Sequence, residues 1–116
     1  MSILAEKSYQ FAIRIVRLNQ YLQQEKKEYV LSKQLLRSGT AIGALIAEAQ
    51  YAQSKADFVS KLQISLKEAN ESKYWLRLMK DCHYLEEKMA RSILQDIDAL
   101  LKMLTSSINT TKEKIQ

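Results

Sequence analysis

The stretch Arg37-Ser-Gly-Thr-Ala-Ile-Gly-Ala-Leu-Ile-Ala-Glu48 has ten uncharged residues between one arginine and one glutamate. Both glycines of the chain, Gly39 and Gly43, lie within it. Glycine costs about 1 kcal/mol relative to alanine in the interior of a helix. Two glycines four residues apart on a helix therefore predict that another backbone packs very close to this segment.

The composition indicates an all-α protein with a single domain spanning residues 1–116. The chain has no proline and only these two glycines, and helix-forming residues dominate. A single cysteine, Cys82, and the lack of a secretory signal favour the cytoplasm. The longest uncharged apolar run is about half of the roughly 20 residues that a membrane-spanning helix needs. We therefore expect no membrane partner.

Apolar residues recur at alternating steps of four and three, which is typical of helices packed in a bundle. The pattern predicts helices over residues 2–24, 30–53, 55–81 and 86–109. Ser54-Lys-Ala-Asp57 resembles a capping box and sets the break before the third helix. The tail after Ile108 loses the period and is expected to fray. Short connections between four helices predict an antiparallel up-down-up-down four-helix bundle.

Small residues also lie in the middle of the third predicted helix, at Ser65, Ala69 and Ser72. Together with Gly39 and Gly43 they predict a close approach of the second and third helices. The alternative is that the small residues make room for large partners such as Phe11 and Trp75. These two helices also carry apolar residues outside the face that each turns to the bundle core. Because this is more apolar surface than one bundle needs, it predicts self-association.

The charges at the ends of the opening stretch need partners or solvent. Arg37 and Glu48 are three helical turns apart, too far to pair within one helix. Our hypothesis is that they meet Glu68, Glu71 or Lys61 at a helix or subunit interface and fix its register. A solvated row of charges is the alternative.

The net charge of +5 is concentrated in the first half of the chain. Residues 7–47 carry seven basic residues against two acids, which accounts for the whole excess. Such a patch favours nucleic-acid binding, although it is equally compatible with an ordinary basic surface. The candidate nucleic-acid-binding residues are Lys7, Arg14, Arg17, Lys33, Lys73, Arg77 and Lys80.

The chain offers little for catalysis. His83 is the only histidine, and its neighbour Cys82 is the only cysteine, so neither a zinc spacing nor a nucleophile with its base is present. The Gly39-x-x-x-Gly43 spacing lacks the Gly-Lys-Ser/Thr of a phosphate-binding loop. We therefore expect no enzymatic activity, no catalytic residue, no metal and no cofactor.

Three segments carry a resemblance to a known family. They are residues 35–49, Ser54-Lys-Ala-Asp-Phe58 and Lys67-Glu-Ala-Asn-Glu-Ser-Lys-Tyr-Trp-Leu76. In order and spacing they resemble the four-helix-bundle proteins encoded in intervening sequences of bacterial 23S ribosomal RNA genes, the S23-type ribosomal proteins. The residues that match the family motif or share its packing are Arg37, Ser38, Gly39, Thr40, Gly43, Glu48, Glu68, Glu71 and Trp75. Ala41 and Leu45 depart from the serine and asparagine usual at these positions, and both changes remove polar groups.

The resemblance implies a bundle that assembles into a ring, since homopentamers are known among relatives, and it implies no established enzymatic activity. A more distant likeness is to the accessory variability determinant of diversity-generating retroelements, a basic pentameric bundle that works with a reverse transcriptase. We therefore expect a self-associating protein that binds RNA or DNA through its basic surface. The alternative is a protein-binding adaptor, for example for a reverse transcriptase or a ribosome-processing partner.

Overall fold

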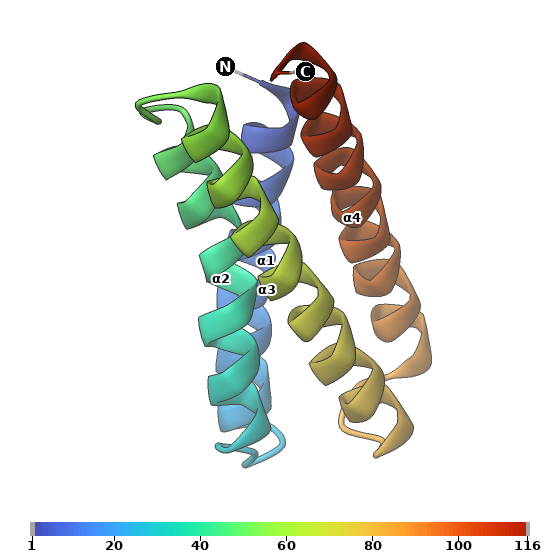
Figure 1. Ribbon diagram of the computed structural model, residues 1–116. Helices are drawn as coiled ribbons and strands as arrows, with labels where there is room; N and C mark the ends of the chain where they lie inside the picture. The colour runs from blue at the N-terminus through green and yellow to red at the C-terminus, as the bar shows by residue number, and fades with distance from the viewer. Residues whose placement is uncertain (1, 116) are drawn as a thin grey trace.

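Short connections determine how the helices of this protein are arranged. The computed structural model describes residues 2–115, excluding the side chain of residue 115, and holds four helices over that range. They are α1 (Ile3–Gln24), α2 (Leu31–Ala49), α3 (Lys55–Asp81) and α4 (Glu87–Ile115). Successive helices run in opposite directions in a bundle about 48 Å long (Figure 1). The predicted all-α, up-down-up-down four-helix bundle is confirmed.

The helix starts follow from side-chain caps. Ser2 Oγ accepts a hydrogen bond from the backbone N–H of Ala5, at 3.1 Å, and so caps α1. Ser54 Oγ accepts one from the N–H of Asp57, at 3.0 Å, and the Asp57 carboxylate accepts one from the N–H of Gln53, at 3.2 Å. The predicted cap at Ser54 is confirmed.

A different device caps α2. Glu28 is buried, and its carboxylate accepts hydrogen bonds from the backbone N–H groups of Val30, Leu31 and Ser32 at 3.0, 3.0 and 2.7 Å. Burial raises the pKa of Glu28, but these backbone donors outweigh it and hold the pKa below the ordinary value. The apolar repeat that predicts the helices gives no signal for this role of Glu28.

Two predicted helix ends are wrong. The second helix ends at Ala49 rather than at residue 53, because the N–H groups of Gln50 and Tyr51 bond carbonyls three residues back and tighten the chain into a turn. The fourth helix continues through the predicted frayed tail to Ile115. Lys112, Glu113 and Lys114 have good helix propensity, and the two lysines lie in the last turn, where the helix dipole favours cations.

The glycines of α2 face α1. A Cβ atom at Gly39 would lie 2.9 Å from two carbon atoms of the Ile15 side chain, and one at Gly43 would lie 3.2 Å from the Ser8 carbonyl oxygen. The predicted close approach of another backbone is therefore found at Gly43, but both glycines meet the first helix and not the third. The approach of α3 to α2 depends on serines, because Ser65 Oγ donates to the Ile42 carbonyl at 2.9 Å and the Ser72 and Ser38 hydroxyls bond each other at 2.9 Å.

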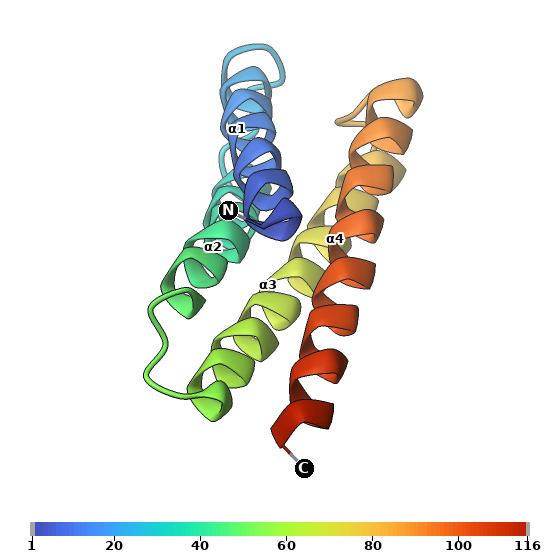
Figure 2. The ribbon, with the colours of Figure 1, turned by 90° about the horizontal axis from the view of Figure 1, so that it is seen from above.

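The core follows the repeat of four and three residues along each helix. In α1, every residue at these steps from Leu4 onward is buried: Leu4, Ser8, Phe11, Ile15, Leu18 and Leu22. Extensive contacts join α1 to α2, α2 to α3 and α3 to α4, whereas α4 meets α1 over a smaller area (Figure 2). The side where α1 and α4 meet is therefore the loosest seam of the bundle. Among residues 2–115, none of the helices combines the length and apolar character needed to cross a bilayer.

Candidate nucleic-acid interface

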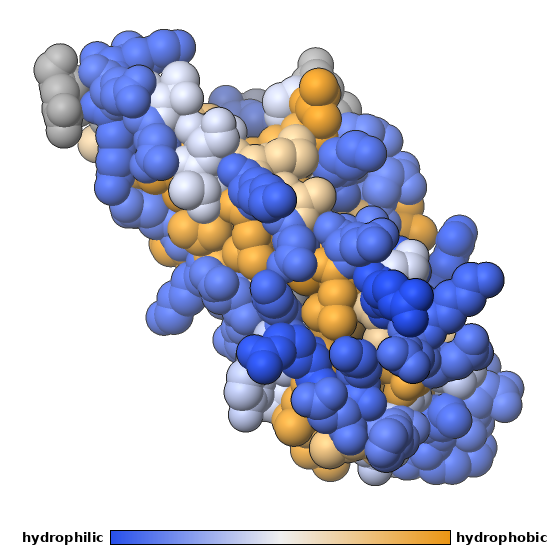
Figure 3. Space-filling view, turned by 90° about the vertical axis from the view of Figure 1, so that its right-hand side faces the viewer, coloured by the Kyte–Doolittle hydropathy of each residue, from blue (hydrophilic) through white to orange (hydrophobic). Residues whose placement is uncertain are grey.

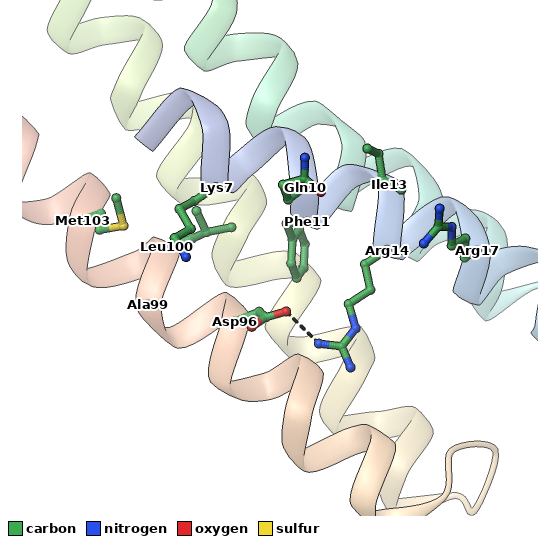
Figure 4. Close-up of a pocket in the computed structure, with 10 residues that line it drawn as sticks. All are labelled: Lys7, Gln10, Phe11, Ile13, Arg14, Arg17, Asp96, Ala99, Leu100 and Met103. Carbon is green, nitrogen blue, oxygen red and sulfur yellow. Dashed lines mark hydrogen bonds and ion pairs between the residues drawn. The ribbon is translucent and has the colours of Figure 1, made fainter. Parts of the chain in front are cut away.

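A groove runs between α1 and α4 and is formed by two adjoining hollows. The first, of about 450 Å³, is lined by Lys7, Gln10, Phe11, Ile13, Arg14 and Arg17 of α1 and by Asp96, Ala99, Leu100 and Met103 of α4 (Figure 4). The second, of about 250 Å³, is lined by Arg14, Arg17, Leu18, Tyr21, Met89 and Ile93. Arg14 and Arg17 line both hollows, so the two adjoin, and together they are called here the α1–α4 groove.

Cations line this groove above an apolar floor. Lys7, Arg14 and Arg17 all come from α1, where steps of seven and three residues keep them on one side of the helix. Asp96 is the one acid among the described residues that line either hollow. Figure 3 shows the α4 side of the molecule, on which a band of apolar surface emerges between hydrophilic side chains. The groove therefore offers phosphate-binding charge beside apolar surface.

Arg14 is the one of these three cations that makes side-chain hydrogen bonds with α4 in the described part of the chain. Its Nη1 atom lies 2.7 Å from Asp96 Oδ2, and its Nη2 atom donates to Ser92 Oγ at 2.9 Å. Both partners belong to α4, one helical turn apart. Lys7 and Arg17, by contrast, make no ion pair within the described part of the chain.

The other four candidate cations line neither hollow. Lys33 lies exposed on α2. Lys73, on α3, pairs with Asp98 of α4 at 2.7 Å, and Arg77 and Lys80 follow it on α3. The structure therefore brings together three of the seven predicted residues. Asp96, which lines the groove, and Ser92, which bonds Arg14, were not among the predicted residues. The sequence holds a signal for the position of Asp96 on its helix, because Asp96 lies beside the buried apolar residues of α4 as Arg14 lies beside those of α1.

The family-motif charges form a separate network on α2 and α3. Arg37 Nη1 lies 3.2 Å from Glu68 Oε2, and its Nη2 atom pairs with Glu71. Trp75 Nε1 donates to the same Glu71 oxygen, Oε2, at 3.0 Å. The hypothesis that Arg37 pairs with Glu68 or Glu71 is confirmed for the contact between helices. Glu48 is exposed and has no ion-pair partner among residues 2–114. The hypothesis that Glu48 also pairs with a neighbouring helix is therefore not supported.

The remaining motif residues are structural. Ser38 and Gly39 are buried, and the Thr40 hydroxyl donates to the Leu36 carbonyl at 2.7 Å within the helix.

Gly43 also borders a separate hollow between α1 and α2, called here the α1–α2 groove. It measures about 590 Å³ and is lined by Ala5, Glu6, Tyr9, Ala12, Thr40, Gly43, Ala44, Ala47, Gln50 and Tyr51. Tyr9 and Tyr51 are 63% and 87% exposed, which leaves aromatic surface beside a shallow apolar groove.

Within the described residues, no three His, Cys, Asp or Glu side chains lie together in a way that could hold a metal ion. Cys82 and His83 are both exposed in the turn between α3 and α4, where His83 adopts a positive φ of 65°. These two residues serve the turn that reverses the chain.

Comparisons with known proteins agree with this architecture. The family model described as 23S rRNA-intervening sequence protein matches residues 2–106. A crystal structure of a protein of unknown function from the S23 ribosomal protein family of Bacteroides thetaiotaomicron VPI-5482 is 51% identical to this chain, with a TM-score of 0.90. The match covers 91% of this chain and 98% of that one. No curated protein matches the sequence significantly.

Proposed function

Since this chain belongs to the family of 23S rRNA-intervening sequence proteins, we propose that it is a non-enzymatic protein that binds RNA or DNA. The α1–α4 groove is the proposed site. The observation that carries the proposal is the gathering of Lys7, Arg14 and Arg17 along one groove with a single acid among its described lining residues.

The chemistry of such a groove suits a polyanion. Each cation can neutralise one backbone phosphate and release the counterion that phosphate held. The apolar floor can cover the faces of bases or sugars without sequence preference. Three phosphate contacts per chain give only modest affinity, so we propose that several copies act together and multiply the contacts.

Self-association is part of the same proposal. The α1–α2 groove, with exposed Tyr9 and Tyr51 beside it, supports the docking of a second copy of this chain. A ring-shaped homo-oligomer, with a pentamer favoured by the family resemblance, would present several α1–α4 grooves on one particle. The proposal places this particle in the cytoplasm, where the exposed Cys82 thiol stays reduced.

Charge-matched variants test the site. Lys7, Arg14 and Arg17 are replaced together with glutamine, and the control variant carries K33Q, R77Q and K80Q, which remove the same charge outside the groove. Retention of labelled single-stranded RNA on a column of immobilised protein should be lost in the groove variant and kept in the control. Retention by the groove variant equal to that of the wild type would move the site elsewhere.

A protein-binding adaptor is the second candidate function, and the apolar α1–α2 groove is the observation that favours it. The partner would be a protein such as a reverse transcriptase or a ribosome-processing factor. Apolar docking depends little on salt, whereas phosphate binding weakens steeply as salt rises. Binding to a protein partner that is unchanged between low and physiological salt, with no retention of RNA, would favour the adaptor.

A further inference from the structure

Arg14 spans the α1–α4 groove at the point where its two hollows meet. Figure 4 shows the Arg14 side chain extending from α1 to α4, with the Asp96 carboxylate directed at its guanidinium. The Nη1 atom is 2.7 Å from Asp96 Oδ2, and the Nη2 atom is 2.9 Å from Ser92 Oγ. Both terminal nitrogens of the guanidinium are therefore already engaged by α4.

This bridge removes the charge of Arg14 from the groove. A backbone phosphate would bind Arg14 through the same N–H groups that now contact Asp96 and Ser92. It would also meet the negative charge of the Asp96 carboxylate a few ångströms away. A phosphate can therefore use Arg14 only by displacing Asp96.

The bridge is weak enough to open. The Arg14 and Asp96 side chains are 35% and 48% exposed, so water already competes for the pair. Lys7 and Arg17 have no comparable partner within the described residues and remain free to hold a ligand next to the bridge.

We infer that Asp96 sets the affinity and selectivity of the groove, because its carboxylate occupies the place on Arg14 that a backbone phosphate takes in the complex. The inference rests on the proposed function. A single phosphate gains too little to displace Asp96. A strand whose neighbouring phosphates are held by Lys7 and Arg17 raises the local phosphate concentration at Arg14 and opens the bridge. The groove therefore selects chains over mononucleotides and inorganic phosphate.

The experiment compares D96N with D98N. Both variants change the net charge by the same amount on the same helix, but Asp98 pairs with Lys73 of α3 outside the groove. Binding of a fluorescein-labelled single-stranded RNA of mixed sequence is followed by fluorescence anisotropy. We expect D96N to bind about tenfold more tightly than the wild type, and D98N less than about twofold. Equal gains in the two variants would overturn the inference.

The R14Q background shows whether Asp96 acts through Arg14. In that background, D96N should gain no more than D98N does, less than about twofold, because only charge repulsion is relieved and there is no bridge to release. A tenfold gain that persists in R14Q would mean that Asp96 only repels the ligand, and would overturn the bridge. Inorganic phosphate should compete with RNA only weakly in the wild type, and its inhibition constant, corrected for the RNA affinity of each variant, should be lower in D96N. An unchanged inhibition constant would count against the selectivity.

Failure of the inference differs from failure of the proposed function. If the wild type binds RNA and the K7Q/R14Q/R17Q variant does not, while D96N binds as the wild type does, the groove is the site and Asp96 does not control it. If the wild type and D96N both fail to bind at about 50 mM salt, where phosphate contacts are strong, the nucleic-acid function itself is wrong. Thermal unfolding followed by circular dichroism checks that each variant is folded.

Discussion

Replacing Gly39 with alanine should destabilise the bundle, although alanine is the better helix former. On helix propensity alone, G39A would gain about 1 kcal/mol. The new Cβ atom, however, would lie 2.9 Å from both Cγ1 and Cγ2 of Ile15, a side chain with no exposed surface. Overpacking of a core costs about 1 to 3 kcal/mol. We expect a net loss of about 1 kcal/mol, or about 4 °C in Tm for a domain of this size.

The assay is urea denaturation followed by circular dichroism at 222 nm, with further variants as controls. Q34A and Q34G, at an exposed position of α2 outside both grooves, measure the difference between alanine and glycine in the same helix, and Q34G should be less stable than Q34A by about 1 kcal/mol. I15A removes every Ile15 atom that the new Cβ would touch, so G39A should cost nothing, or stabilise, in the I15A background. I15V keeps both close carbon atoms and should not rescue G39A.

The reasoning would be refuted by a G39A protein that is as stable as the wild type or more stable. It would also be refuted if G39A cost the same in the I15A background as in the wild type, because two residues in direct contact must show coupling. Either result would mean that α1 does not pack against Gly39.

Three further predictions concern the Glu28 cap, the ion pairs and assembly. Because the pKa of Glu28 is lowered in the folded state, its contribution is fully present above the ordinary value of 4.5 and is lost as the pH falls through the lower folded value. E28Q should cost about 1 kcal/mol at neutral pH and should flatten the acid side of the stability curve, measured by urea titration at a series of pH values. R37Q and E68Q should couple by about 0.5 kcal/mol in a double-mutant cycle, since Arg37 is half exposed, and zero coupling would show that the pair contributes nothing. Replacing Tyr9 and Tyr51 with serine should shift the mass measured by light scattering towards the monomer; an unchanged mass would place the interface elsewhere, and a monomeric wild type at micromolar concentration would remove the ring.

The features that could be predicted from the sequence are those set by local patterns. The period of apolar residues placed all four helices, and the Ser54 to Asp57 pattern placed a cap that the structure contains. The length of α4 could not be read from the same period. Beyond Ile108 the helix continues through polar residues, of which Lys112, Glu113 and Lys114 are good helix formers, without the apolar repeat.

The features that could not be predicted depend on which helices meet. The glycines of α2 indicated close packing, but the direction in which they point follows from the rotation of α2 against both neighbours. Arg14 and Asp96 are 82 residues apart in the chain, so their pairing needs the register of α1 against α4. The Arg37 pairing was predicted because a charge in an otherwise uncharged stretch needs a partner from the helix beside it.

The salt dependence of RNA binding tests the central claim most directly. If Lys7, Arg14 and Arg17 each neutralise a phosphate, the plot of log K against log salt concentration should have a slope of about −2 for each bound chain, from roughly 0.7 per contact on a single strand. The K7Q/R14Q/R17Q variant should lose most of that slope, and the K33Q/R77Q/K80Q control should keep it. A wild-type slope near zero, or a slope that the groove variant retains, would contradict the assignment of the α1–α4 groove as a nucleic-acid site.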